Sequence, residues 1–131
     1  MTTIDLTHET FEQTVLDNDI VLVDFWATWC GPCRAFAPIY EAAAKANPDL
    51  VFAKVDTQAQ PQLAAEFSIR SIPTLFVFRE RTLVFAQPGM LPKASLEDLI
   101  RQVRALDMDA VRARIEEERK KGASAEPRAS R

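Results

Sequence analysis

Two cysteines, Cys30 and Cys33, are the residues of this chain whose type and spacing predict chemistry. If a helix begins at Cys30, side chains three positions apart lie on one face of it, so the two thiols can close a small disulfide ring. Cys30 would lie at the helix N-terminus, where unpaired backbone N–H groups and the helix dipole stabilise a thiolate, the form that attacks disulfides. We therefore interpret Cys30 as the attacking thiol and Cys33, one turn further on, as the resolving thiol.

The two residues between the cysteines fit this interpretation. Gly31 has no side chain, so the backbone of another protein can come close to the thiols. Pro32 suits the first helical turn, where its missing N–H would have had no partner within the helix. The dipeptide therefore predicts an accessible disulfide at a helix start.

A zinc site is the main alternative for a Cys-x-x-Cys pair, and it requires two more thiolate or imidazole ligands. The chain contains two cysteines and one histidine, His8. We therefore expect no metal bound within one chain, although a metal shared between two chains stays open. His8 itself is interpreted as a solvated residue of a surface helix and not as a catalyst.

The segment Trp29-Cys30-Gly31-Pro32-Cys33, preceded by Val23-Asp24-Phe25-Trp26-Ala27, resembles the active site of the thioredoxin family. Cys-x-x-Cys alone is common, but this pattern behind a strand that carries an acid is specific, and the resemblance continues to about residue 105. It implies a protein-disulfide reductase that exchanges its dithiol for a client's disulfide. It also implies that no cofactor is bound, since the cysteines carry the electrons, and that an NADPH-dependent flavoprotein, thioredoxin reductase, donates them.

The resemblance also gives roles to Asp24 and Lys54. An acid in a central strand would be desolvated and would hold its proton unusually tightly, although strand position alone also allows Asp24 to point to an exposed edge. The family has an acid here that moves protons for the buried cysteine. Lys54 matches the family's lysine near that acid, although by itself it looks like an ordinary charge on a strand surface.

Pro73 precedes an apolar strand, in the segment Ser71-Ile72-Pro73-Thr74. Trans is the usual state of any X-Pro bond, but the family's matching proline is cis and faces the cysteines, and we follow the family. The Ile72 backbone and the loop at Gly89 would then form a groove that receives an extended client segment. Trp29 is the expected apolar contact in this groove, whereas Trp26 is assigned to the core.

Three departures from the family pattern lie near this groove or on the adjacent hairpin. Ser71 stands where the family usually has glycine, and Pro88 precedes Gly89 where a small β-branched residue is common. The hairpin turn at residues 79–81 lacks an Asn-Gly type of signal. The first two departures alter the groove rim, and therefore the choice of client, but not the chemistry.

Apolar periodicity predicts an α/β fold. The expected strands cover residues 3–6, 20–26, 50–55, 74–78 and 82–86, and the expected helices cover residues 7–17, 30–46 and 61–67, followed by a helix with Leu96, Leu99, Ile100 and Val103 on one face. The run 20–26 is almost continuously apolar, as in a strand covered on both sides at the centre of a sheet. The alternation of strands and helices, followed by a hairpin, indicates a central mixed sheet of about five strands with helices on both faces. This architecture agrees with the thioredoxin fold that the resemblance implies.

Length and composition limit the remaining possibilities. A chain of 131 residues with 47% hydrophobic content is long enough for one core and short for two. The net charge of −3 gives no reason to expect nucleic acid, which requires a basic surface. The N-terminus has no signal-peptide pattern and no apolar run is long enough to span a bilayer, so we expect a cytoplasmic protein without membrane contact.

We expect the chain to divide into a domain that resembles thioredoxin at residues 1–106, an additional C-terminal helix at 107–121 and a disordered tail at 122–131. Asp107 is a plausible N-cap, and Met108, Val111 and Ile115 form a thin apolar stripe. A short helix of this kind is marginal alone in water, so it must dock or fray. We expect it to dock through that stripe on its own domain or on a second copy, away from Cys30.

Two other functions stay open at this point. The protein could be an oxidant or isomerase, although the absence of a signal peptide and the Gly-Pro between the cysteines argue against that. Alternatively, the fold could serve as a binding module in which redox turnover is incidental. Replacing both cysteines by serine distinguishes the module from the reductase, since only the module keeps its cellular role.

Overall fold

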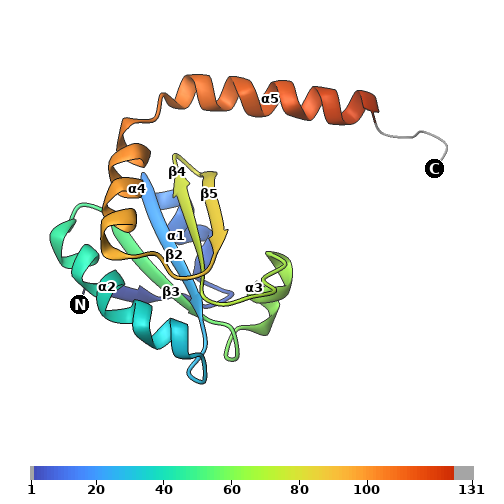
Figure 1. The fold of residues 1–131 in the computed structure, drawn as a ribbon. Coiled ribbons are helices and arrows are strands. Elements are labelled where there is room, and N and C mark those ends of the chain that lie inside the picture. Colours follow the sequence, from blue (N-terminus) through green and yellow to red (C-terminus); the bar gives the residue numbers. More distant parts are fainter. Residues whose placement is uncertain (1, 126–131) are drawn as a thin grey trace.

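A five-stranded mixed sheet forms the centre of the computed structural model, which describes residues 2–125 (Figure 1). The strands are β1 (Thr3–Asp5), β2 (Ile20–Trp26), β3 (Val51–Asp56), β4 (Thr74–Arg79) and β5 (Thr82–Pro88). Their spatial order is β1-β3-β2-β4-β5, with β1, β3 and β2 parallel and with β4 antiparallel to both of its neighbours. The predicted fold and the central position of β2 are confirmed.

Helices cover both faces of this sheet. They are α1 (Phe11–Asp17), α2 (Gly31–Ala46), α3 (Pro61–Glu66), α4 (Lys93–Ala105) and α5 (Met108–Ala125). The core divides accordingly into two clusters, one beneath α2 and α4 and one beneath α1 and α3. The second cluster is rich in phenylalanine, and rings from the helices and from the sheet meet edge to face in it.

The sequence of β2 explains its central place, because nearly every side chain in it is apolar and buried on one face or the other. Val21, Val23 and Phe25 enter the cluster under α1 and α3, and Leu22 enters the cluster under α2 and α4. Because side chains alternate along a strand, Asp24 lies on the same face as Leu22, the face that α2 covers. The strand therefore places the side chain of Asp24 on the face covered by the helix that begins at the cysteines.

Three expected boundaries differ in the structure. The first helix begins at Phe11 with Thr10 at the N-cap position, and not after Thr7, so His8 lies in a turn. Strand limits move by one or two residues, which is within the ordinary fraying of element ends. The last helix continues past Gly122 to Ala125, whereas we expected it to end at residue 121. The remainder of the predicted disordered tail, residues 126–131, lies outside the described residues.

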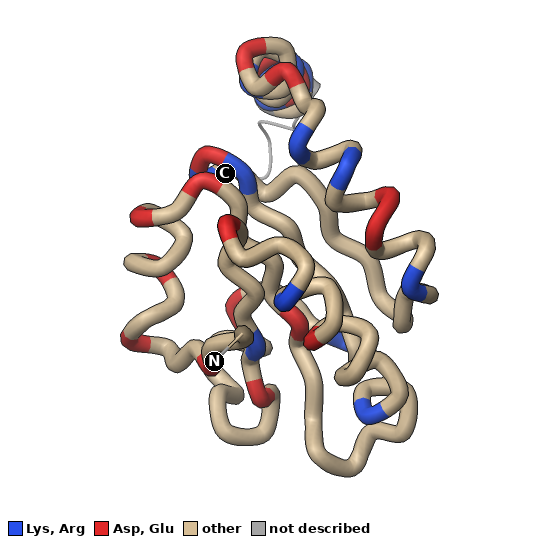
Figure 2. The backbone as a smooth tube through the Cα atoms, turned by 90° about the vertical axis from the view of Figure 1, so that its left-hand side faces the viewer, with Lys and Arg blue, Asp and Glu red and all other residues tan. Residues whose placement is uncertain are grey.

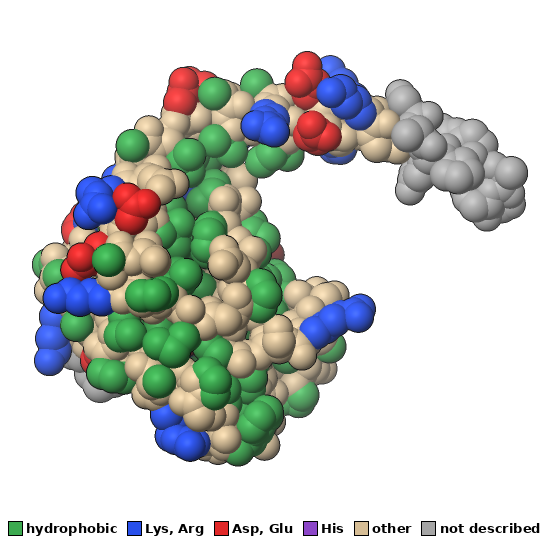
Figure 3. Space-filling model, in the orientation of Figure 1, with side chains coloured by type: hydrophobic (Ala, Val, Ile, Leu, Met, Phe, Trp, Pro, Cys, Tyr) green, Lys and Arg blue, Asp and Glu red, His purple; other side chains and the backbone are tan. Residues whose placement is uncertain are grey.

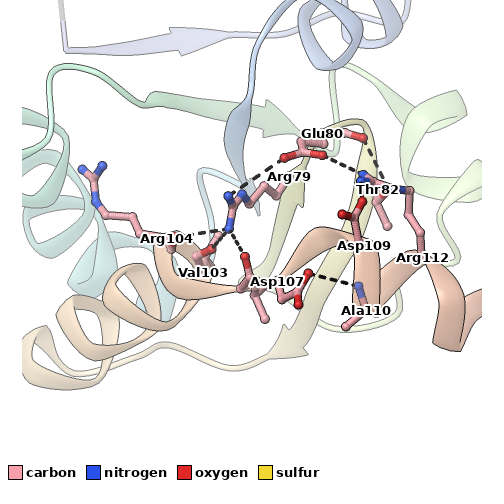
Figure 4. Close-up of polar contacts among 10 residues, drawn as sticks. Arg79, Glu80, Thr82, Val103, Arg104, Asp107, Asp109, Ala110 and Arg112 are labelled. Atoms are coloured by element: carbon pink, nitrogen blue, oxygen red, sulfur yellow. Dashed lines mark hydrogen bonds and ion pairs between the residues drawn. The ribbon is translucent and has the colours of Figure 1, made fainter.

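The extra helix α5 is attached at the hairpin end of the sheet, opposite the end where β2 leads into α2 (Figure 1). Arg79, at the end of β4, donates through Nη1 to the carbonyl oxygens of Val103 at 2.8 Å and Leu106 at 2.8 Å, where α4 ends (Figure 4). Glu80 in the hairpin turn accepts from Nη1 of Arg112 on α5 at 2.6 Å. Two turn residues therefore hold the α4–α5 corner in place.

Apolar contact and capping also place the start of α5. Met108 is buried, and the carboxylate of Asp107 accepts from the backbone N–H of Ala110 at 3.2 Å, so the predicted N-cap is confirmed. Further along, Val111 is half-buried and Ile115 is exposed, so the predicted docking through the stripe is limited to its first part. Acidic and basic residues both lie on α5, and their red and blue segments overlap in the view along the helix (Figure 2).

Candidate active site

The two cysteines form a disulfide at the start of α2, with their Cα atoms 5.2 Å apart. Cys30 is the N-cap residue of the helix, and its Sγ accepts the backbone N–H of Cys33 at 3.2 Å. This position matches the prediction from the spacing. Both side chains are buried, so the difference between them comes from position: Cys30 receives an N–H donor and the positive end of the helix dipole.

The surface beside the disulfide is open to a large partner. Trp29 is 65% exposed and precedes the cysteine directly, as expected for an apolar contact. A Cβ atom added at Gly31 would meet no other atom within 4 Å, so this backbone faces open space. Pro32 occupies the first turn of α2 without loss of a helix hydrogen bond.

The loop before β4 lies against the cysteines, although it is far from them in the sequence. The Ile72–Pro73 peptide bond is cis, as predicted. The carbonyl oxygen of Ile72 lies 3.6 Å from Sγ of Cys30, and the carbonyl oxygen of Pro73 accepts the N–H of Gly89 at 2.7 Å. Gly89 has a φ of 95°, which side chains rarely allow. The structure therefore brings Ile72, Pro73 and Gly89 together beside Cys30.

Asp24 is 1% exposed, and neither carboxylate oxygen has a hydrogen-bond partner within residues 2–125. Burial raises the pKa of Asp24 from 3.8 to about 7, because desolvation penalises the charged carboxylate, while the charge of Lys54 lowers it in part. The alternative in which Asp24 points to an exposed edge is therefore wrong. A buried acid that titrates near neutrality is suited to exchange a proton during catalysis.

Lys54 lies on β3 directly beside Asp24 on β2. Its Nζ is 4.7 Å from the ring centroid of Trp26, over the face of the indole, which is a cation–π arrangement. Trp26 is half-buried, and its Nε1 lacks a hydrogen-bond partner among the described residues. The structure thus groups Asp24, Lys54 and Trp26 on one face, with the lysine near enough to act on the acid through its field.

Two residues that support the site, Arg34 and Tyr40, were not predicted from the sequence. Arg34 donates through Nη1 to the carbonyl oxygen of Thr28 at 2.8 Å, which ties the first turn of α2 to the loop before Cys30. Tyr40 is buried under the sheet and donates to the carbonyl oxygen of Ala53 at 2.8 Å; burial first, and the nearby Asp24 second, raise its pKa. Neither residue belongs to a recognisable motif, so only the fold identifies them.

The described residues contain no group of three or more histidine, cysteine or acidic side chains placed to hold a metal ion. His8 lies beside Glu66, with Nε2 and Oε1 3.5 Å apart. Within the same part of the chain, none of the helices combines the length and the apolar character needed to cross a membrane.

Comparison with known proteins agrees with this geometry. The family model for thioredoxin matches residues 2–102. The chain belongs to the thioredoxin family. Putative thioredoxin 2 of Streptomyces coelicolor is 63% identical over 116 residues, which cover 88% of this chain and 87% of that protein. The solved structure of a mutant thioredoxin from Halobacterium salinarum superposes with a TM-score of 0.73 at 33% identity, over 80% of this chain and 94% of that one.

Membership of the thioredoxin family assigns the activity. The chain is a thiol-disulfide oxidoreductase that reduces protein disulfides by dithiol–disulfide exchange, with Cys30 and Cys33 as its redox-active disulfide. The Streptomyces match is 116 residues long and covers 88% of this chain, so it continues past α4 and reaches α5. Thioredoxin C-3 of Corynebacterium nephridii is 43% identical over 100 residues, which cover 76% of this chain and 69% of that protein.

Proposed function

We propose that Cys30 is the thiol that attacks client disulfides and that Cys33 resolves the mixed disulfide. The observation that carries this assignment is the N-cap position of Cys30, where its sulfur receives the N–H of Cys33 at 3.2 Å. That donor and the helix dipole stabilise negative charge on Cys30 when the disulfide is reduced. Its thiolate then forms a bond to one client sulfur and displaces the other as a thiolate.

Asp24 accepts the proton of Cys33 in the second step. The Cys33 thiol loses this proton and attacks Sγ of Cys30, so that the Cys30–Cys33 disulfide forms and the client leaves as a thiolate that takes a proton from water. A carboxylate with a pKa of about 7 is a suitable base near neutral pH, and it lies on the face that α2 covers. Lys54 keeps this pKa from rising further, because its positive charge favours the carboxylate.

Clients bind as extended segments in the groove formed by Trp29, Gly31, Pro32, Ile72, Pro73 and Gly89. Trp29 offers an exposed apolar surface, and Gly31 leaves room for a second backbone. Backbone groups of the Ile72–Pro73 segment give such a peptide partners that do not depend on its sequence. The groove therefore suits disulfides in many different clients.

An NADPH-dependent flavoprotein, thioredoxin reductase, is the electron donor that family membership supports. The chain needs no bound cofactor of its own for this cycle, because two electrons enter and leave as the Cys30–Cys33 dithiol. We assign the cycle to the cytoplasm, where thiols are kept reduced.

Reduction of insulin tests the assignment. Cys30→Ser is expected to abolish turnover, whereas Cys33→Ser is expected to leave a trapped mixed disulfide between Cys30 and insulin, seen by mass spectrometry under non-reducing conditions. In the native reduced protein, iodoacetamide should label Cys30 before Cys33. Faster labelling of Cys33 would reverse the two roles, and full turnover by the Cys30→Ser variant would exclude the mechanism.

A further inference from the structure

A groove lies between α5 and the outer edge of the sheet, at the start of β5. It has a volume of about 360 Å³, its walls include Leu83 and Val84 from β5 and Val111 and Ile115 from α5, and Arg114 and Glu118 also line it. Figure 3 shows the hollow beneath the projecting helix, with hydrophobic atoms on the underside of its first half. The elements that form it lie at the opposite end of the sheet from the start of α2, which Cys30 caps (Figure 1).

The walls of this groove leave large apolar side chains in water. Leu83 is 43% exposed and Ile115 is 47% exposed, although both face a concave surface. Burial decreases along α5 from Met108, which is buried, to Ile115, because the helix leaves its own domain after two turns. A helix in that position has little to stabilise its second half unless another surface meets it.

The outer edge of β5 is only lightly protected. Within the described residues β5 pairs with β4 alone, so one row of its backbone N–H and C=O groups faces outward. Edge strands are commonly protected from pairing with another chain by charges, by proline or by a β-bulge. The seven residues from Thr82 to Pro88 include no charge; Pro88, at the end, lacks a donor, and the register with β4 shifts at Val84, which is left out of that pairing.

We propose that a second copy of this chain docks in this groove, by antiparallel pairing of the two β5 edges beneath α5. The strand is compatible with itself: with Phe85 on the two-fold axis, Leu83 lies opposite the partner's Gln87 and Val84 lies opposite the partner's Ala86. No like charges meet in this arrangement. The irregularity at Val84 interrupts this ladder, and pairing on both sides of it would join the two sheets into one.

Charge argues against the other self-association, in which two α5 helices pair side by side. Charged side chains, Arg112 on one side and Arg114 and Glu118 on the other, flank the apolar stripe of α5, so two paired helices would have to desolvate them. Arg112 is, in addition, already bound to Glu80. The uncharged strand edge is therefore the part of this surface that suits a second copy.

The position of α5 fits a two-fold axis at the β5 edge. Antiparallel pairing places the start of one β5, where Arg112 fixes α5 to the turn, beside the end of the other, near the partner's Gly89. An 18-residue helix is about 27 Å long, enough to cross several strands spaced about 4.8 Å apart. The exposed half of α5 would then lie across the end of the partner's sheet that contains its client groove.

Sedimentation velocity of the full chain under reducing conditions tests the proposal, because a reductant prevents dimers linked by disulfides. The apolar patch is small, so we expect weak association with a Kd on the order of 100 µM, visible as a sedimentation coefficient that rises with concentration. Leu83→Glu and Ile115→Glu should both abolish this rise. Leu16→Glu is the matched control, since Leu16 is 46% exposed on α1, away from the groove.

Hydrogen exchange gives a second readout that does not depend on variants. Outward-facing amides of β5 should exchange more slowly at high protein concentration, while those at the exposed end of α1 should not change. A chain that stays monomeric up to about 1 mM overturns the proposal and leaves the groove to a foreign segment. A dimer that persists in both groove variants, is lost in Leu16→Glu, or forms without added protection in β5 overturns it as well.

Discussion

The two ends of the sheet differ in whether their polar side chains have hydrogen-bond partners. At the end with Cys30, Asp24 and Nε1 of Trp26 are buried without a hydrogen-bond partner among residues 2–125. At the hairpin end, Arg79 donates to backbone carbonyls through Nη1 and leaves only Nε unpaired, and Glu80 binds Arg112. Unpaired buried polar groups lower the stability of the fold. The end with Cys30 therefore keeps a costly buried acid for its chemistry, whereas the polar groups of the hairpin end hold α5 in place.

The largest effect is expected from Asp24→Asn. In the folded protein the pKa of Asp24 is about 7, against an ordinary value of 3.8, so between these pH values the native state binds a proton that the unfolded state has lost. The contribution of Asp24 to the free energy of unfolding is therefore greatest below pH 4 and falls as pH rises to about 7. Removing the charge should raise the free energy of unfolding at pH 8 by roughly 2–4 kcal/mol in urea titrations.

The same substitution should slow insulin reduction, because Cys33 loses its base, and should remove the inflection near pH 7 from the pH profile of turnover. Asp5→Asn, at an exposed acid of β1, is the control and should change neither property. If Asp24→Asn were less stable than the wild type at pH 8, the buried charge of Asp24 would not be destabilising.

A smaller loss is expected at the other end from Met108→Ala. Met108 is the buried side chain among residues 108–122 of α5, and truncation of a buried methionine in a packed site lowers the free energy of unfolding by about 2 kcal/mol. Denaturant titration measures this change, and Met90→Ala is the control because Met90 is exposed. An unchanged stability would show that α5 is held by its arginine contacts alone.

Arg81→Gly should stabilise the protein slightly. Glu80 and Arg81 have φ values of 50° and 66°, in a hairpin turn that favours glycine or asparagine. Glycine removes the conformational penalty at Arg81 and should raise the free energy of unfolding by about 0.5–1 kcal/mol relative to Arg81→Ala, which removes the side chain but keeps the penalty. Equal stability of the two variants would mean that backbone conformation is not what limits this turn.

The smallest effect on turnover is expected from truncation after Leu106. Because α5 is attached at the hairpin end of the sheet, the shortened chain should reduce insulin at the same rate per folded molecule, within about twofold, when assayed at concentrations where the chain is monomeric. Circular dichroism controls for folding. A large fall in turnover by a folded truncated chain would mean that the two ends are coupled.

The sequence predicted the elements that depend on local signals. The apolar run of β2, the helix that begins at Cys30 and the Asp107 cap all follow from residues close together in the chain. The cis state of Pro73 and the place of Lys54 followed from family resemblance, since neither residue type requires them. The start of α1 was missed because Thr7 and Thr10 can both precede a helix.

Attachment of α5 could not be predicted, because its contacts join distant residues. Arg79 meets a carbonyl 27 positions further on, and Arg112 meets a glutamate 32 positions earlier. Charged side chains on surface elements have many possible partners of similar energy, and only the fold selects among them. The prediction that the last helix ends before Gly122 was wrong for a different reason. The helix penalty of glycine, about 1 kcal/mol, is too small to end a helix by itself.

Both tryptophans of the chain, Trp26 and Trp29, lie within four residues of Cys30 in the sequence, at the end of β2 and directly before the cysteine. Tryptophan fluorescence therefore reports on this end of the molecule. Excitation of the native protein follows the opening and closing of the disulfide without any attached dye, whereas α5 of the same chain is attached at the opposite end of the sheet. A stopped-flow fluorimeter can thus time each half-reaction on the unmodified chain.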